Sequence, residues 1–257
     1  MADFTGKIAL VTGTTGIGRA VALRLAKGGA TVVALGIDEA ANDALSRTEA
    51  AIRARRTDVA EPAQVEDALR EIERDFGGLD IIVNAAAVHP YGDAVTTDPR
   101  TFQHCLAVNV GSIHLTAHWG VPLMRKRGGG AIVNISSVQG HACQPGVAAY
   151  VASKGAIHAL TRAMALDFAA DGIRVVSVSP GSVRTPILEL AARTFDGPDA
   201  DVEAAFARFG AAHPIGRIGE PEEIAELIAF LVSSKAGFIT GSDYVIDGGL
   251  TAAIGVR

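Results

Sequence analysis

The chain has 257 residues, 49% of them apolar and 20% charged, which suits one α/β domain with a large core. Its net charge is −5, and without a basic block this argues against a nucleic-acid partner. No apolar run approaches the about 18 residues that span a bilayer. Because a signal-peptide pattern is also missing, we expect a cytoplasmic protein with no membrane partner. Cys105 and Cys143 have no metal-ligand spacing, so no metal site is expected.

The first part of the chain has the pattern of a dinucleotide-binding βαβ unit. An apolar run at 7–12 predicts a strand, and a glycine-rich turn from Gly13 to Gly18 follows it. Apolar residues at helical spacing then continue over 20–26, and a second strand is expected at 31–35. Glycines let the backbone approach a pyrophosphate, and the helix N-terminus offers unpaired N–H groups. The turn is therefore a candidate phosphate site.

Strands and helices continue to alternate along the rest of the chain. Further strands are expected at 55–59, 79–83, 131–136, 173–179 and 244–246. Further helices are expected at 62–76, at 99–127, over the stretch that carries Tyr150 and Lys154 and extends to about 170, and from 220 onward. The segment 185–215 is less regular and is expected to be a mobile substrate-binding flap. The whole pattern predicts a Rossmann-like, doubly wound parallel sheet of about seven strands with helices on both faces, as a single domain over 1–257.

Tyr150 and Lys154 are four residues apart and would share one face of a helix. A positive charge beside a phenol favours the phenolate. Lowering the tyrosine pKa from about 10 by about 3 units requires roughly 4 kcal/mol, so a second cation, such as an oxidised nicotinamide ring, would have to help. Ser137 could present a second hydroxyl to the same substrate oxygen. Taken alone, such a Tyr/Lys pair is more often a solvated helix face.

Several polar or glycine residues fall at the ends of predicted strands. In doubly wound sheets, ligands bind beyond the carboxyl ends of the strands. We therefore expect one site that is formed by Gly13, Asp58, Asn84, Ser137 and the Pro180-Gly181 pair.

In their order and spacing these motifs resemble the short-chain dehydrogenase/reductase family in its compact single-domain form, and the likeness covers essentially the whole chain. The motifs that carry the resemblance are the turn 12–18, Asp58-Val59, Asn84, Asn109, Ser137, Tyr150 with Lys154, Pro180-Gly181 with Thr185, Arg217-x-Gly219-x-Pro221-x-Glu223, and Asp247-Gly248-Gly249. The resemblance implies hydride transfer to or from a nicotinamide, coupled to proton transfer through a side chain.

By the same resemblance, Tyr150 is the general acid/base, and Lys154 lowers its pKa and holds the nicotinamide ribose. Ser137 hydrogen-bonds the reacting oxygen, and Asn109 orders a water that links Lys154 to solvent. The implied cofactor-binding residues are Gly13, Thr15, Gly16, Ile17, Gly18, Asp58, Val59, Asn84, Tyr150, Lys154, Pro180, Gly181, Val183 and Thr185. Family members commonly form tetramers, so a homotetramer is expected.

The chain departs from the family pattern at three places. Two residues, instead of the usual three, separate Gly13 from Gly16. The sequence 84–87 is Asn-Ala-Ala-Ala, whereas the family usually has Asn-Asn-Ala-Gly. The acidic residue that often ends the second strand falls at Gly36, and Asp38 two positions later is a candidate displaced ribose ligand. Because no lysine or arginine stands there for a 2′-phosphate, NAD is predicted in preference to NADP.

The substrate pocket is expected to receive polar side chains from His89, Gln139, His141 and Gln144. These predict a small polar substrate such as a sugar, polyol or sugar acid, and hence a role in carbohydrate metabolism. The alternative within the family is a 3-oxoacyl thioester reductase. An alternative of another class is a catalytically inactive dinucleotide-binding regulator. An epimerase of the larger related family is disfavoured, because the chain has no room for a separate substrate domain.

Overall fold

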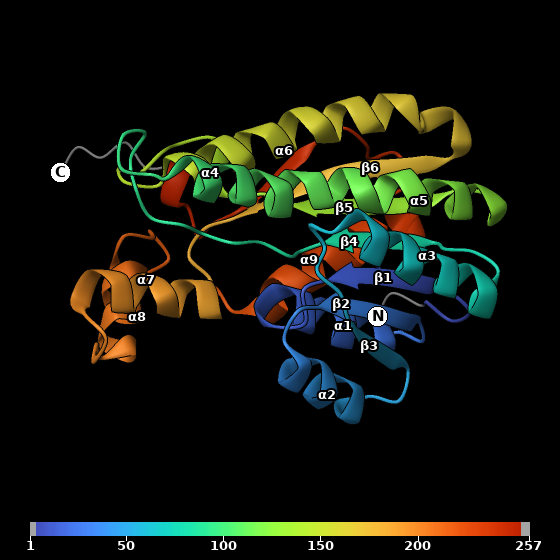
Figure 1. The fold of residues 1–257 in the computed structure, drawn as a ribbon, viewed down its shortest axis with the longest axis horizontal. Helices are drawn as coiled ribbons and strands as arrows, with labels where there is room; N and C mark the ends of the chain where they lie inside the picture. Colours follow the sequence, from blue (N-terminus) through green and yellow to red (C-terminus); the bar gives the residue numbers. More distant parts are fainter. Residues whose placement is uncertain (1–3, 253–257) are drawn as a thin grey trace.

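The computed structural model describes residues 4–252, so the two ends of the predicted domain, 1–3 and 253–257, lie outside it. One sheet of seven parallel strands, in the order β3-β2-β1-β4-β5-β6-β7, forms the centre (Figure 1). The strands are β1 Ile8–Thr12, β2 Thr31–Gly36, β3 Ile52–Arg56, β4 Ile81–Asn84, β5 Gly130–Ile135, β6 Ile173–Pro180 and β7 Asp243–Ile246. The helices are α1 Gly16–Lys27, α2 Glu39–Thr48, α3 Pro62–Phe76, α4 Pro99–Leu106, α5 Ser112–Lys126, α6 Ala148–Asp167, α7 Pro186–Asp196, α8 Val202–Ala211 and α9 Pro221–Val232. The predicted doubly wound parallel sheet is confirmed.

The central strands are buried on both faces, which is why the sequence shows continuous apolar runs there. Successive side chains of a strand point to opposite faces, so each strand contributes to two separate cores. In β1, Val11 faces the core beneath α1 and α9, whereas Leu10 faces the core beneath α3, α5 and α6. Figure 1 shows these two helix layers on either side of the sheet. Within residues 4–252, no helix is both long enough and apolar enough to cross a membrane.

The third strand lies earlier in the chain than predicted, at Ile52–Arg56 instead of 55–59. As the edge strand β3 buries only Ile52 fully, its apolar signal is weak. Asp58 and Val59 consequently lie in the loop that follows the strand. The preceding helix α2 was not predicted, although Asp38 caps it by accepting a hydrogen bond from the Ala41 N–H at 3.1 Å.

The prediction that 185–215 is irregular is wrong, because this segment contains the two helices α7 and α8, whereas its role as a substrate-binding flap stays a prediction. Thr185 caps α7, and its hydroxyl accepts from the Leu188 N–H at 3.4 Å. Asp201 caps α8 by accepting from the Ala204 N–H at 3.1 Å. Short polar caps of this kind satisfy the free N–H groups of a helix start. Figure 1 shows the two helices side by side, set apart from the layers that cover the sheet.

Candidate active site

A cavity of about 820 Å³ lies beyond the carboxyl ends of the strands, within the range of about 300–1,000 Å³ that is usual for ligand sites. It brings together most of the predicted site residues. Those in its lining are Gly13, Thr15, Gly16, Ile17, Asp38, Asp58, Val59, His89, Ser137, Gln139, Gln144, Tyr150, Lys154, Pro180, Gly181, Val183 and Thr185. The lining does not include Gly18, Asn84, Asn109 and His141.

Tyr150 and Lys154 lie one turn apart on α6, and both are buried. The Lys154 Nζ lies 5.2 Å from the centroid of the Tyr150 ring and donates a hydrogen bond to the Ile135 carbonyl at 2.9 Å. The Ser136 hydroxyl donates to the Lys154 carbonyl at 2.9 Å, so it positions the helix. Ser137, one residue further along, lines the cavity and shares a hydrogen bond with the Tyr150 phenol.

Burial is the largest influence on both titrating groups. It raises the pKa of the Tyr150 phenol above its ordinary value, while the hydrogen bond with Ser137 acts in the opposite direction. It also lowers the pKa of Lys154 to about 8. The role of Lys154 in lowering the tyrosine pKa stays a prediction, because burial is the largest influence on the phenol in this structure. An additional positive charge next to the phenol is required to make the phenolate accessible near neutral pH.

Asn109 lies in a short π-helical turn, Ala107–Gly111, between α4 and α5. Its side chain is buried, and its Oδ1 accepts from the Val88 N–H at 2.8 Å. Its Nδ2 donates to the Val88 carbonyl at 3.0 Å and to the Ser153 hydroxyl at 2.9 Å. The side chain therefore holds the loop after β4 against α6, and the predicted role of Asn109 in ordering a water stays a prediction.

Asn84 directs its side chain into a buried chain of polar groups behind the cavity. Its Oδ1 accepts from the Thr116 hydroxyl at 2.8 Å, and its Nδ2 donates to Asn134 Oδ1 at 2.8 Å. The sequence analysis missed Thr12, whose hydroxyl accepts from the N–H groups of Ala85 and Ala86 at 3.0 and 3.1 Å. These bonds hold the alanines, rather than the Asn84 side chain, at the cavity wall.

The glycine turn fits the pyrophosphate of a dinucleotide, even with its missing residue. Gly13 and Gly16 have φ values of +89° and +49°, a region that side chains rarely adopt. A Cβ on Gly18 would lie 2.2 Å from the Gly13 carbonyl oxygen, so the turn can close only with glycine there. No side chain caps α1 at Thr15, so N–H groups at the helix start are free to bind an anion.

The far end of the cavity, where an adenosine would lie, has no room for an acidic side chain at position 36. A Cβ on Gly36 would lie 2.1 Å from Thr14 Oγ1 and 2.5 Å from Asn42 Oδ1. Asp38 reaches the lining while it caps α2. Asp58 closes a tight turn by accepting from the Ala60 N–H at 2.9 Å. Packing by Thr14 and Asn42 therefore accounts for the departure at Gly36.

His89 lies beside the predicted general base. Its ring centroid is 4.0 Å from that of Tyr150 and 4.8 Å from that of Tyr91. Burial, assisted by the Lys154 charge, lowers the pKa of His89 to about 4, so the imidazole is neutral at physiological pH. Its Nδ1 is buried and has no hydrogen-bond partner in the described part of the chain.

Helices α7 and α8 complete the substrate end of the cavity. The edge of the Tyr91 ring meets the Phe195 ring of α7 at a centroid distance of 5.4 Å and an angle of 80°. Leu188, Phe195 and Phe209 also line the cavity, and sequence reasoning missed them. Their signal was the helical spacing of the apolar residues of α7, together with its cap. His141, by contrast, points to Asp243 at 2.7 Å, which corrects its predicted place in the substrate pocket.

Comparisons with known proteins agree with this architecture. The family described as enoyl-(acyl carrier protein) reductase matches residues 11–251. A cyclohexanol dehydrogenase from Acinetobacter sp. (strain SE19) is 36% identical, over 97% of this chain and 96% of that protein. A cis-4-hydroxycyclohexanecarboxylate dehydrogenase from Sinomonas cyclohexanicum is 38% identical, over 97% of this chain and 98% of that protein. The ligand-free structure of an aldohexose dehydrogenase from Thermoplasma acidophilum is similar with a TM-score of 0.93 and 33% identity, over 100% of this chain and 98% of that one.

Proposed function

The chain belongs to the short-chain dehydrogenase/reductase family, as an NAD(P)-dependent alcohol dehydrogenase/ketoreductase, and on this premise we propose that its substrate is an uncharged six-membered ring. The reaction interconverts a secondary alcohol on that ring and the ketone. The series of rings formed by His89, Tyr91 and Phe195 next to Tyr150 is the observation that carries this proposal. It offers a wall of tilted aromatic rings beside the proton-transferring phenol.

The faces and edges of these rings can pack against the C–H groups of a ring substrate and remove its apolar surface from water. Two buried polar atoms in the lining, His89 Nδ1 and Gln139 Oε1, have no partner within residues 4–252. A buried polar atom without a hydrogen bond costs about 1–3 kcal/mol. A rotation of either side chain that turned this atom into the cavity would let a further hydroxyl group on the ring satisfy it, which supports a sugar or another cyclic alcohol.

The charges of the cavity support an uncharged substrate. Among the described residues of the lining, Lys154 is the only lysine or arginine, and its Nζ already donates to a backbone carbonyl. A carboxylate or a phosphate-bearing thioester carrier would bury its charge there without a dedicated cation, which is costly. The sugar-acid part of the sequence-based prediction and the 3-oxoacyl thioester alternative are therefore less well supported than a neutral sugar or carbocyclic alcohol.

Proton transfer is assigned to Tyr150, with Ser137 as its partner at the substrate oxygen. The Ser137 hydroxyl, which hydrogen-bonds the phenol, would hold the alcohol or ketone oxygen against Tyr150. Lys154 would bind the ribose and keep a positive charge next to the phenol. The nicotinamide supplies or accepts the hydride when it is bound. The glycine turn and the start of α1 would hold the pyrophosphate of the dinucleotide. Proton transfer would then depend on the residues of α6.

The same distribution of charge supports NAD in preference to NADP. The adenosine end of the cavity contains Asp38 and Asp58, and none of its described lining residues is a lysine or arginine. Arg56, the nearest arginine along β3, forms an ion pair with Glu39 at 3.3 Å. A 2′-phosphate would meet carboxylates there, whereas a ribose diol could donate hydrogen bonds to them. The homotetramer and the cytoplasmic location stay predictions from the family resemblance.

Initial rates on a small substrate panel test this proposal. The panel contains cyclohexanol, an aldohexose, cis-4-hydroxycyclohexanecarboxylate, a sugar acid and, in the reverse direction, a 3-oxoacyl thioester, each with NAD(H) and NADP(H). We expect kcat/KM on a neutral ring with NAD to exceed that on the charged substrates by about tenfold or more. A preference for the thioester, or for NADP with every substrate, would contradict the proposal. No turnover with intact dinucleotide binding would favour the inactive regulator.

A further inference from the structure

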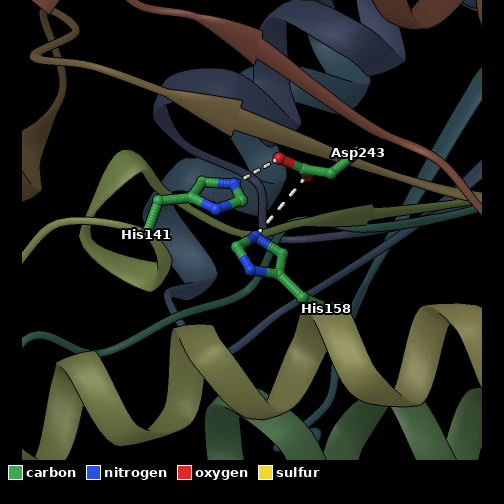
Figure 2. Close-up of side chains that lie close together, drawn as sticks. All are labelled: His141, His158 and Asp243. Carbon is green, nitrogen blue, oxygen red and sulfur yellow. Dashed lines mark hydrogen bonds and ion pairs between the residues drawn. The ribbon is translucent and has the colours of Figure 1, made fainter. Parts of the chain in front are cut away.

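Two histidines and an aspartate gather outside the lining of the cavity, and Figure 2 shows both imidazole rings turned toward one carboxylate. His141 belongs to the loop after Ser137, His158 to α6, and Asp243 to the start of β7. The His141 Nε2 lies 2.7 Å from Asp243 Oδ2, and the His158 Nε2 lies 3.5 Å from Asp243 Oδ1. All three donor groups have an atom within 4.8 Å of the others. We propose that this cluster is a Zn²⁺ site.

The donor set is the first argument. Two imidazole nitrogens and one carboxylate oxygen are common Zn²⁺ ligands in proteins, with water in the remaining position. Ligand atoms around a tetrahedral Zn²⁺ are about 3.4 Å apart, given Zn–N bonds of about 2.0–2.1 Å. The present separations, from 2.7 Å to at most 4.8 Å, surround that value. Closing the site therefore requires shifts of about 1 Å, and no change in the backbone of α6 or β7.

The rings must also rotate, because they are now stacked at a centroid distance of 4.2 Å and an angle of 23°. A metal ion lies in the plane of each imidazole that binds it, so parallel rings cannot both face one ion. His141 can supply this rotation, since its side chain is 43% exposed and sits on a loop. His158 is 8% exposed, and its ring can stay in place if the ion replaces the present contact of its Nε2 with the Ser179 hydroxyl at 3.0 Å. Both bind as neutral imidazoles with the remaining proton on Nδ1.

Two serine hydroxyls orient the carboxylate, and one of them, that of Ser179, also lies 3.0 Å from the His158 Nε2. Asp243 Oδ1 accepts from the Ser177 hydroxyl at 2.6 Å and from the Ser179 hydroxyl at 2.9 Å. Partners of this kind fix the direction of a metal-binding carboxylate and raise metal affinity.

Gly140 and Arg162 both affect how well the site can bind a cation. A Cβ on Gly140 would lie 2.5 Å from His158 Cε1, so only glycine leaves the ring in its place. The positive charges that act on His158 are those of Arg162 and Lys154, and they oppose a bound cation. Arg162 is exposed and follows His158 by one turn of α6, so it can be replaced without loss of a ligand.

Isothermal titration of the untagged full-length protein with ZnCl₂, after dialysis against a chelator, tests the site. The proteins compared are wild type, the variant His141→Ala, and a control variant in which both His114 and His118 are replaced by alanine. These two histidines are an exposed pair on α5, with ring centroids 5.8 Å apart. That control removes a surface histidine pair without touching the cluster. Loss of an outer partner alone costs about 10–100-fold in metal affinity, so His141→Ala should weaken Zn²⁺ binding by at least about tenfold. The α5 variant should bind as wild type does.

A second pair of variants keeps all three ligands. Gly140→Ala should weaken binding because the added methyl group displaces His158, and Arg162→Gln should strengthen it because a repelling charge is removed. Thermal unfolding with chelator shows that each variant folds, and added Zn²⁺ should raise the Tm of wild type but not of His141→Ala. Absence of binding by wild type, loss of binding only in the α5 variant, or a folded His141→Ala with wild-type affinity would overturn the proposal.

Discussion

The two halves of the cavity are built in different ways. The half predicted to hold the dinucleotide consists largely of backbone: the turn at Gly13–Gly18, the strand ends and the start of α1. The half predicted to hold the substrate consists of side chains from the loop after β4, the loop after β5, and helices α7 and α8. The first depends on the absence of Cβ atoms at Gly18 and Gly36. The second depends on which rings and amides project into it.

This contrast separates the half of the cavity whose side chains can vary from the half whose backbone cannot. A backbone site binds the same ligand whatever the neighbouring side chains are, because its donors are peptide N–H groups. A side-chain site can change its substrate with a single replacement and leave the sheet intact. Variants in the two halves should therefore affect dinucleotide affinity and substrate kinetics separately. Tyr150 lies where the halves meet.

The largest effect is expected at that junction. Tyr150→Phe removes the only atom assigned to proton transfer and leaves the ring packed against His89. General acid–base groups contribute about 10²–10⁴-fold, so kcat should fall by that factor while the Kd for NADH, from a fluorescence titration, changes little. Near-normal turnover in this variant would refute the role of Tyr150. A parallel loss of NADH binding would mean that the two halves are not separable.

The substrate half should also control the stability of the protein in mild acid. The pKa of His89 falls from 6.5 to about 4 in the folded protein, so between these values the unfolded chain binds the proton and the folded one does not. Stability is therefore full above pH 6.5 and falls as the pH drops toward 4, by about 3 kcal/mol at 1.36 kcal/mol per pH unit. Urea unfolding of His89→Gln should show a flatter pH profile than wild type. An unchanged slope of the free energy of unfolding against pH would exclude His89 as the cause of the acid sensitivity. The control is His114→Ala, which replaces an exposed histidine.

In the dinucleotide half, Gly18→Ala should weaken NADH binding. The added Cβ would lie 2.2 Å from the Gly13 carbonyl oxygen, and relief of such overpacking typically costs about 1–3 kcal/mol. Gly111→Ala is the matched control, because its φ of −57° is helical and its nearest contact is 3.7 Å. We expect a higher Kd for NADH and a lower Tm only in Gly18→Ala. Equal behaviour of the two variants would show that the turn is not closely packed.

The smallest effect is expected at the contact between α7 and the loop after β4. Phe195→Ala removes the edge-to-face contact with Tyr91, and such pairs contribute about 0.5–1.5 kcal/mol. The KM for the ring substrate should rise by about 2–10-fold at an unchanged Kd for NADH. Leu190→Ala, on the same helix but outside the cavity lining, should leave KM as it is. A rise in KM for both variants would mean that α7 acts through its overall packing.

Most of the sheet and the placement of Tyr150 beside Lys154 followed from the sequence, because both rest on local patterns. Central strands such as β1 and β4 are buried on both faces and so read as unbroken apolar runs. Tyr150 and Lys154 lie on one face because a helix repeats every 3.6 residues. The prediction failed where the local signal was weak. In the edge strand β3 only Ile52 is fully buried, and α7 and α8 are short helices marked by their caps and by the apolar spacing of α7.

Only the tertiary structure decided how residues remote in sequence meet and how far each is removed from water. It raised the pKa of Tyr150 by burial, turned Asn84 away from the cavity, and placed the His89 ring at a tilt beside the phenol ring. It also brought His141, His158 and Asp243 to one point, where the sequence indicated no metal site. The physical reason is that periodicity acts over a few residues, whereas burial and long-range contacts depend on the packing of the whole chain.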